Sequence, residues 1–191
     1  MPNPPTDTGF HELWPPATRG YFAIGAERMS KSLNLGNLMR SAHGFGASFT
    51  FTVGATYQAL EARADTSKGQ LHLPHYNWPS IEAMALPQGC TLVGVELVAD
   101  AVDLPSFRHP LRAAYVLGPE QGSLSAELLS RCTYVVRIPT SFCINVAMAG
   151  AIVMYDRLRC MGRFADRPVG EGGPQPPSSA PPRTRGKFGR K

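Results

Sequence analysis

The sequence has few cysteines and no long hydrophobic run, and each absence excludes a class of protein. Its four cysteines, Cys90, Cys132, Cys143 and Cys160, lie far apart and form no CxxC pair, so no disulfide scaffold or zinc ribbon is indicated. The longest apolar stretch, residues 144–155, is too short for a transmembrane helix, which needs about 20 residues. The first residues lack the basic start and apolar region of a signal peptide. We therefore predict a cytoplasmic protein without a membrane span.

The sequence also lacks the glycine-rich patterns of the common nucleotide-binding folds. There is no P-loop, and GFG at residues 44–46 does not continue as GxGxxG. No segment recurs with a period of 20 to 50 residues. His72 and His75 are three residues apart, but no carboxylate or cysteine completes a ligand set, so no metal is expected.

Charge and proline content divide the 191-residue chain into three predicted parts. Residues 1–19 are a Pro-rich arm, residues 20–161 a folded domain, and residues 162–191 a tail. Residues 1–161 hold 12 of the 19 basic and 12 of the 14 acidic residues, so the net charge of +5 lies entirely in the tail. This Pro- and Gly-rich tail has too few apolar residues to fold. It either attracts a polyphosphate by counterion release or only keeps the chain soluble.

Within the predicted domain, apolar runs of strand length alternate with helical stretches. Strands that are apolar throughout favour a parallel sheet covered by helices on both faces, and hence an α/β fold. Strands are predicted at residues 21–25, 48–53, 91–97, 113–117 and 134–138, and helices at 37–45, 57–64, 81–86, 126–131 and 145–161.

Three loops follow strands at their carboxyl ends, where open α/β sheets bind ligands. In the first, Asn34 can cap the next helix and Asn37 adds a second polar group. Arg40, one turn further on, either faces a phosphate or reacting hydroxyl or is an ordinary solvated arginine. In the second, Gly118 and Gly122 allow a ligand close to the backbone, or only form a tight turn.

The third loop runs from Ile138 to Asn145 and leads into the last predicted helix. Small residues share one face of that helix at helical spacing. This face would let another helix approach closely, either from a second subunit or from the core of the same chain. The small-residue face comprises Ala147, Gly150, Ala151 and Met154.

Taken in order, the three loops are far more specific than any one of them. They read N-x-G-N-x-x-R-x-A-x-x-F-G from Asn34, L-G-x-E-x-x-x-L-S from Leu117, and I-P followed by N-V-A-x-A-x-A-I-x-x-Y from Ile138. Over residues 20 to about 160 the chain resembles the SpoU/TrmH family of SPOUT RNA 2'-O-ribose methyltransferases.

The resemblance implies a C-terminal deep trefoil knot, an exception to the rule that chains do not knot. It implies that S-adenosylmethionine (SAM) binds bent in the knot, largely through backbone groups and without a metal. It also implies that Arg40 acts on the ribose 2'-hydroxyl, either as an unusual proton acceptor or as an electrostatic stabiliser. The other implied catalytic residues are Asn34, Glu120 and Asn145, with Asn37 nearby. The implied cofactor-binding residues are Val95, Glu96, Leu117, Gly118, Gly122, Ile138, Pro139, Cys143 and Ile144.

Two departures from the family pattern concern the third loop. Only Thr140, Ser141 and Phe142 separate Pro139 from the next motif, and Cys143 stands where serine is usual. A thiol is a weaker hydrogen-bond partner than a hydroxyl, so a side-chain contact to RNA is in doubt there, whereas a backbone contact to SAM is not.

We expect a homodimer whose substrate is RNA, with tRNA favoured over rRNA. A knotted protein that binds SAM or RNA without catalysis is the alternative. Tyr76 and Trp78 either stack on unpaired bases or pack their own loop against the domain.

Overall fold

The structure is a computed structural model that describes residues 20–56, 73–162 and 164–173. The predicted helix at 57–64, the N-terminal arm and most of the tail lie outside these residues. None of the helices described is long and apolar enough to cross a membrane.

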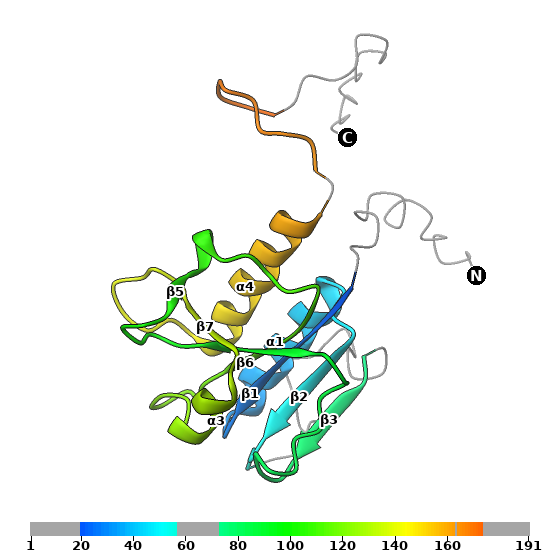
Figure 1. The fold of residues 1–191 in the computed structure, drawn as a ribbon, viewed down its shortest axis with the longest axis vertical. Coiled ribbons are helices and arrows are strands. Elements are labelled where there is room, and N and C mark those ends of the chain that lie inside the picture. The colour runs from blue at the N-terminus through cyan, green and yellow to red at the C-terminus, as the bar shows by residue number, and fades with distance from the viewer. Residues whose placement is uncertain (1–19, 57–72, 163, 174–191) are drawn as a thin grey trace, which may run out of the picture.

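A parallel sheet forms the centre of the molecule (Figure 1). Its strand order is β3-β2-β1-β6-β4-β7-β5, and every neighbouring pair runs parallel. The carboxyl ends of the strands therefore meet at one edge, as the sequence predicts. The strands are β1 Tyr21–Glu27, β2 Phe49–Val53, β3 His75–Trp78, β4 Thr91–Val95, β5 Val102–Asp103, β6 Arg112–Leu117 and β7 Tyr134–Arg137.

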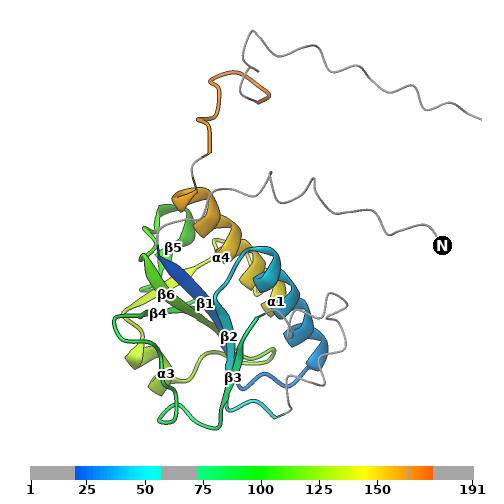
Figure 2. The ribbon, with the colours of Figure 1, turned by 90° about the vertical axis from the view of Figure 1, so that its right-hand side faces the viewer.

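Helices cover both faces of the sheet, which confirms the predicted α/β class. Helices α1 (Ser32–Gly44) and α4 (Val146–Met161) lie side by side on one face, and α3 (Ala126–Arg131) covers the other (Figure 2). A 3-10 turn, η3 (Leu104–Ser106), packs near α4. Because successive strand residues point to opposite faces, Ile24 enters the core under α1 and α4, whereas Ala23 enters the core on the α3 side.

Two predicted helices differ from the structure. Helix α1 begins at Ser32, five residues before the predicted start. The segment 81–86 forms a turn instead of a helix. It is too short to offset the cost of helix nucleation, and a distant side chain, Arg131, donates to the Ile81 carbonyl at 2.7 Å.

The short strands β3 and β5 were not predicted. β3 lies between Pro74 and Pro79, which favour a loop, but its residues pair with β2 from Thr50↔His75 to Val53↔Trp78. Pairing with a neighbouring strand outweighs local preference here.

Most of the small-residue face of α4 packs inside the chain, whereas Ala151 is only half-buried. A Cβ on Gly150 would lie 2.4 Å from Cδ1 of Leu38, on α1, and 3.3 Å from Cδ1 of Ile24, on β1. Ala147 and Met154 are likewise buried. The helix that these residues allow to approach is therefore the chain's own α1.

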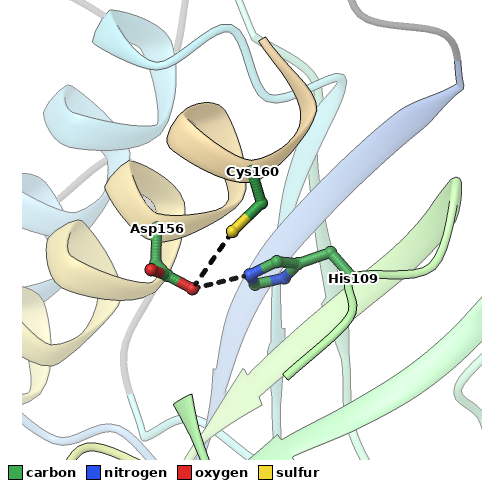
Figure 3. Close-up of side chains that lie close together, drawn as sticks. All are labelled: His109, Asp156 and Cys160. Atoms are coloured by element: carbon green, nitrogen blue, oxygen red, sulfur yellow. Dashed lines mark hydrogen bonds and ion pairs between the residues drawn. The ribbon is translucent and has the colours of Figure 1, made fainter. Parts of the chain in front are cut away.

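His109, which looks isolated in the sequence, lies in a buried hydrogen-bonded cluster between β6 and α4. Its Nε2 lies 3.0 Å from Asp156 Oδ2 and its Nδ1 lies 2.6 Å from the Tyr115 hydroxyl. Cys160 extends the cluster, with Sγ 3.8 Å from the same carboxylate oxygen (Figure 3). Burial lowers the pKa of His109 despite the neighbouring Asp156 carboxylate, which favours the neutral ring.

The same three side chains are close enough to hold a metal ion, since their donor atoms all lie within 4.8 Å of one another. Their hydrogen bonds favour a structural role instead. Nε2 coordination would move the His109 proton to Nδ1 and take away the acceptor of the Tyr115 hydroxyl. Arg159 already pairs with Asp156 at 3.5 Å. We therefore treat the cluster as the link that fixes α4 to the sheet.

Replacing Asp156 with alanine should destabilise the protein, because the buried His109 N–H then loses its acceptor. The expected loss is about 1 to 3 kcal/mol in the free energy of unfolding, measured by urea denaturation. Asp166→Ala, in an exposed segment, is the matched control and should unfold like the wild type. Equal stability of the two variants would contradict a structural role for the cluster.

Candidate functional site

A cavity of about 550 Å³, part of it open to solvent, lies at the carboxyl ends of β4, β6 and β7. Eight of the nine residues predicted for cofactor binding line it, and only Pro139 does not. Sequence reasoning missed five further lining residues, of which all but Ala149, on the first turns of α4, lie within two positions of a predicted one. The lining comprises Val95, Glu96, Leu97, Leu117, Gly118, Pro119, Gly122, Ile138, Thr140, Cys143, Ile144, Val146 and Ala149.

The cavity wall combines apolar side chains with one carboxylate. Glu96 accepts hydrogen bonds from the backbone N–H of Leu97 at 2.9 Å and of Leu124 at 2.7 Å. A Cβ on Gly118 would lie 3.1 Å from the Leu124 nitrogen and 3.2 Å from Glu96 Oε2. Glycine at this position therefore lets the loop after β6 close onto Glu96 without displacing that bond.

Two further side chains hold the loop after β6, and neither was predicted. Glu27, only 2% exposed at the end of β1, accepts from the Ser125 backbone N–H at 2.7 Å. Arg28 donates to the Ser123 carbonyl at 2.9 Å. In sequence both residues look like ordinary loop residues after a strand, because their partners are about 95 positions away.

The Glu120 carboxylate, also on this loop, binds the segment that leads into α1. Its Oε1 accepts from the Lys31 backbone N–H at 2.9 Å and from Asn34 Nδ2 at 3.2 Å. Its Oε2 accepts from the backbone N–H of Ser30 at 3.1 Å and from the Ser30 hydroxyl at 3.0 Å. A carboxylate has about four acceptor positions, so these donors occupy all of them.

These contacts set both the start of α1 and the charge of Glu120. Partial burial acts to raise the pKa of Glu120, but the hydrogen bonds from Ser30, Lys31 and Asn34 outweigh it and the pKa is lowered. A negative charge at a helix N-terminus is also favourable. Asn34 lies inside α1 and does not cap it as the sequence suggested; the N-cap is Lys31, which Glu120 from a distant loop holds by its backbone N–H.

Asn34 connects this contact to the start of α4. Its Oδ1 accepts from Asn145 Nδ2 at 3.0 Å. Asn145 is the N-cap of α4, and its Oδ1 accepts from the backbone N–H groups of Ala147 and Met148. Glu120, Asn34 and Asn145, three of the four predicted catalytic residues, therefore form one continuous hydrogen-bonded network.

Arg40, the fourth, is not part of this network. It is exposed on α1, as is Asn37, and it does not line the cavity. It lies nine positions after Lys31, about 13 Å along the helix axis.

The third loop closes the cavity despite its short length. Thr140 and Cys143 line the cavity, and the Thr140 hydroxyl donates to the Phe142 carbonyl at 2.9 Å. The exposed thiol of Cys143 is therefore at the cavity wall.

Tyr76 and Trp78 pack mainly against their own sheet. Their rings stack with centroids 5.9 Å apart and planes 8° apart, and the Trp78 ring also contacts Phe51. Tyr76 contacts Phe49 and stays half exposed.

Replacing Glu120 with glutamine should weaken the contact at the start of α1. The NH2 group of glutamine cannot accept the hydrogen bonds that Ser30, Lys31 and Asn34 donate to the carboxylate. The free energy of unfolding should fall by about 1 to 3 kcal/mol at pH 7. A lowered carboxyl pKa contributes stability at pH values above the unfolded-state pKa, and this is lost as pH falls through the folded-state value. The variant should therefore lose less stability on acidification than the wild type.

Urea denaturation between pH 3 and 7 measures both effects. Glu171→Gln removes an exposed carboxylate and should behave like the wild type. An unchanged acid dependence in Glu120→Gln would contradict the assigned role of this carboxylate.

Comparison with known proteins places this geometry in a family. Residues 21–155 match the SpoU rRNA Methylase family. Mouse tRNA (guanosine(18)-2'-O)-methyltransferase TARBP1 is 28% identical over 150 residues, which cover 71% of this chain and 9% of the mouse protein.

Two solved structures have the same fold. The SpoU methyltransferase AviRb from Streptomyces viridochromogenes, in complex with AdoMet, is 24% identical with a TM-score of 0.66, over 75% of this chain and 59% of that one. An AdoMet-bound rRNA methyltransferase from Sinorhizobium meliloti is 25% identical with a TM-score of 0.65, over 78% and 59% of the two chains. This chain thus spans less than two thirds of each of these relatives. From the match over residues 21–155, the chain belongs to the SpoU methylase family of RNA methyltransferases.

Proposed function

We propose that the protein is a SAM-dependent RNA methyltransferase that transfers a methyl group to a ribose 2'-hydroxyl, with tRNA as its substrate. The observation that carries this proposal is the cavity at the ends of β4, β6 and β7. Two of its lining residues, Pro119 and Val146, are the sequence neighbours of Glu120 and Asn145 in the hydrogen-bonded network, and the chain belongs to the SpoU family. The mouse relative methylates a tRNA ribose, which supports tRNA. The Sinorhizobium relative acts on rRNA, so rRNA is the second candidate.

The lining of the cavity fits SAM in its chemistry. Leu117, Ile138 and Ile144 can hold the adenine between apolar side chains, and the Glu96 carboxylate can accept from ribose hydroxyls. The missing side chain at Gly118 leaves backbone groups accessible. No metal is needed, because the sulfonium of SAM supplies a methyl group that is already activated by positive charge.

The protein must align the 2'-hydroxyl with that methyl group and stabilise the oxygen as its proton passes to solvent water, while the sulfonium becomes a neutral thioether. We assign this stabilisation to Arg40. A guanidinium, which keeps its proton at neutral pH, is a poor base but a strong partner for an alkoxide or phosphate. Glu120, whose acceptor positions are all occupied, acts as a positioning residue together with Asn34 and Asn145.

A homodimer would bring Arg40 to a cavity that it does not reach in its own chain. The outer face of α4 supports this arrangement, because three apolar side chains at helical spacing are exposed there. Met148 is 59% exposed, Ile152 36% and Tyr155 55%. Packing this face against a second copy would bury these side chains and place α1 of one protomer near the cavity of the other.

We also propose that the C-terminal segment of the domain forms the trefoil knot that the family resemblance implies. The third loop and α4 contribute Thr140, Cys143 and Val146 to a cavity that is also lined by Glu96 and Leu97, from the connection after β4. Passage of the C-terminal segment through that connection would hold both sides of the cavity together.

We also propose the domain division suggested by the sequence, with residues 20–161 as the catalytic domain. In this view the basic tail adds electrostatic affinity for RNA, since the rest of the chain has no net charge. The four unpaired cysteines are consistent with a reducing cytoplasm.

Purified wild-type protein should transfer labelled methyl from SAM to RNA taken from cells that lack the protein. The modified position should resist alkaline cleavage, and fractionation should place the label in tRNA. Arg40→Ala should lower the rate at least about 100-fold, in the range of losing one electrostatic stabiliser. Arg108→Ala, which removes an exposed arginine near the start of β6, is the matched control.

If the label is found in rRNA instead, rRNA and not tRNA is the substrate. Absence of label in RNA, with SAM binding intact by calorimetry, would contradict the proposed methyltransferase activity and favour a knotted protein that only binds SAM or RNA.

Mixing two inactive variants should restore activity if each site uses Arg40 from the partner. Arg40→Ala keeps an intact cavity, and Gly118→Val keeps Arg40 but fills the cavity. Random exchange of subunits should recover about a quarter of the wild-type rate, because half of the dimers then hold one complete site of two. No recovery, with subunit exchange verified by mass spectrometry, would place Arg40 and the cavity in the same chain.

A further inference from the structure

A second cavity, of about 640 Å³ with part of this space open to solvent, adjoins the proposed SAM site. Pro119 belongs to the walls of both cavities. The second cavity has a distinct chemistry, because two of its lining side chains are cations. Its lining comprises Arg28, Ser30, Lys31, Pro119, Glu120 and Gln121.

The Arg28 backbone adopts an unusual conformation at this cavity. With φ at 48°, Arg28 is the only non-glycine residue with positive φ in the part of the chain that the structure describes. Its backbone N–H donates to the Val53 carbonyl at 2.7 Å and its guanidinium to the Ser123 carbonyl at 2.9 Å. Backbone strain held in place by surrounding contacts is typical of functional positions.

The Arg28 guanidinium has hydrogen-bonding capacity left. Its side chain is half exposed, and its Nε lies 3.9 Å from Glu27 Oε1. The Ser123 carbonyl uses one of its five N–H donors. Further donors can therefore serve a ligand in the cavity.

Lys31 supplies the second cation. Its backbone N–H is bound by Glu120, which fixes where its side chain starts. Within residues 20–56, 73–162 and 164–173, its ammonium group has no hydrogen-bond or ion-pair partner. The Glu120 carboxylate does not compete for it, since Ser30, Asn34 and the Lys31 backbone occupy its acceptor positions.

The chemistry of a ribose places a phosphate close to any 2'-hydroxyl that is methylated. C2' bears the hydroxyl, and the neighbouring C3' bears the phosphodiester. A site that presents the hydroxyl to SAM must therefore accommodate an anion within one nucleotide of the methyl group.

We propose that the second cavity binds the phosphodiester next to the target ribose, through the Lys31 ammonium and the Arg28 guanidinium. This inference rests on the proposed function and adds a substrate-positioning site to it. Arg28 has a second role in holding the loop at Ser123, so Lys31 is the residue that tests the site.

The test compares Lys31→Ala and Lys31→Arg with the wild type, and uses Arg108→Ala as a control that removes one exposed cation elsewhere. RNA binding is measured without SAM, over a range of salt concentrations, with RNA from cells that lack the protein. Loss of one phosphate contact should reduce the slope of log affinity against log salt by about one. The KM for RNA should rise roughly threefold to tenfold in Lys31→Ala, by the same loss of one contact, and return toward the wild type in Lys31→Arg.

SAM affinity should stay unchanged in Lys31→Ala. A loss of SAM affinity instead would overturn the proposal, because the cation would then bind the carboxylate of SAM. Wild-type RNA affinity and salt slope in Lys31→Ala would overturn it as well. Absence of methyl transfer by the wild type would overturn the proposed function, whereas the binding slopes still decide whether Lys31 contacts a phosphate.

Neutralising the phosphate gives a direct second test once the target nucleotide is mapped. An oligoribonucleotide with a methylphosphonate 3' to the target ribose should be a poorer substrate for the wild type. It should cause little further loss in Lys31→Ala, because the same contact is then already absent. Equal losses in both proteins would assign Lys31 to another phosphate and contradict this site.

Discussion

The arrangement of the site depends on one carboxylate. Glu120 accepts four hydrogen bonds from Ser30, Lys31 and Asn34, and so joins two loops that are about 90 residues apart. This contact sets where α1 begins, places Asn34 against Asn145, and thereby couples the starts of α1 and α4. The carboxylate takes no part in binding the Lys31 ammonium, because its acceptor positions are filled by other donors. The proposed cofactor and phosphate sites both border the loop that carries Glu120.

The parallel sheet makes this contact possible. β1, β6 and β7 end at the same edge, so segments that are distant in sequence emerge side by side. Buried or partly buried carboxylates then fix the loop after β6, since Glu27 and Glu96 bind consecutive backbone N–H groups of Ser125 and Leu124. Side chains thus supply the acceptors that a loop cannot obtain from a neighbouring strand.

Most of the sheet could be predicted from the sequence, because apolar runs of strand length are a local pattern. Eight of the nine residues that the family resemblance implies for cofactor binding line one cavity, and cofactor binding by them stays a prediction. The residues of α3 were predicted without error, since Ser125 is a local N-cap that accepts from Leu128. Features set by distant contacts could not be predicted in this way. The start of α1 depends on Glu120, the strand β3 depends on β2, and the role of Glu27 depends on Ser125. The small-residue face of α4 was compatible with two partners, and only the packing of Gly150 against Leu38 identifies the one that it meets.

The His109–Asp156 cluster lies toward the C-terminal end of α4, whereas Asn145 lies at its start. One helix therefore carries an anchor at one end and part of the ligand site at the other. Loops at the carboxyl edge can then vary in length and composition, as the short third loop does, while the anchor keeps the helix in register with the sheet. Such a division separates the end of α4 that holds the helix on the sheet from the end that borders the candidate site.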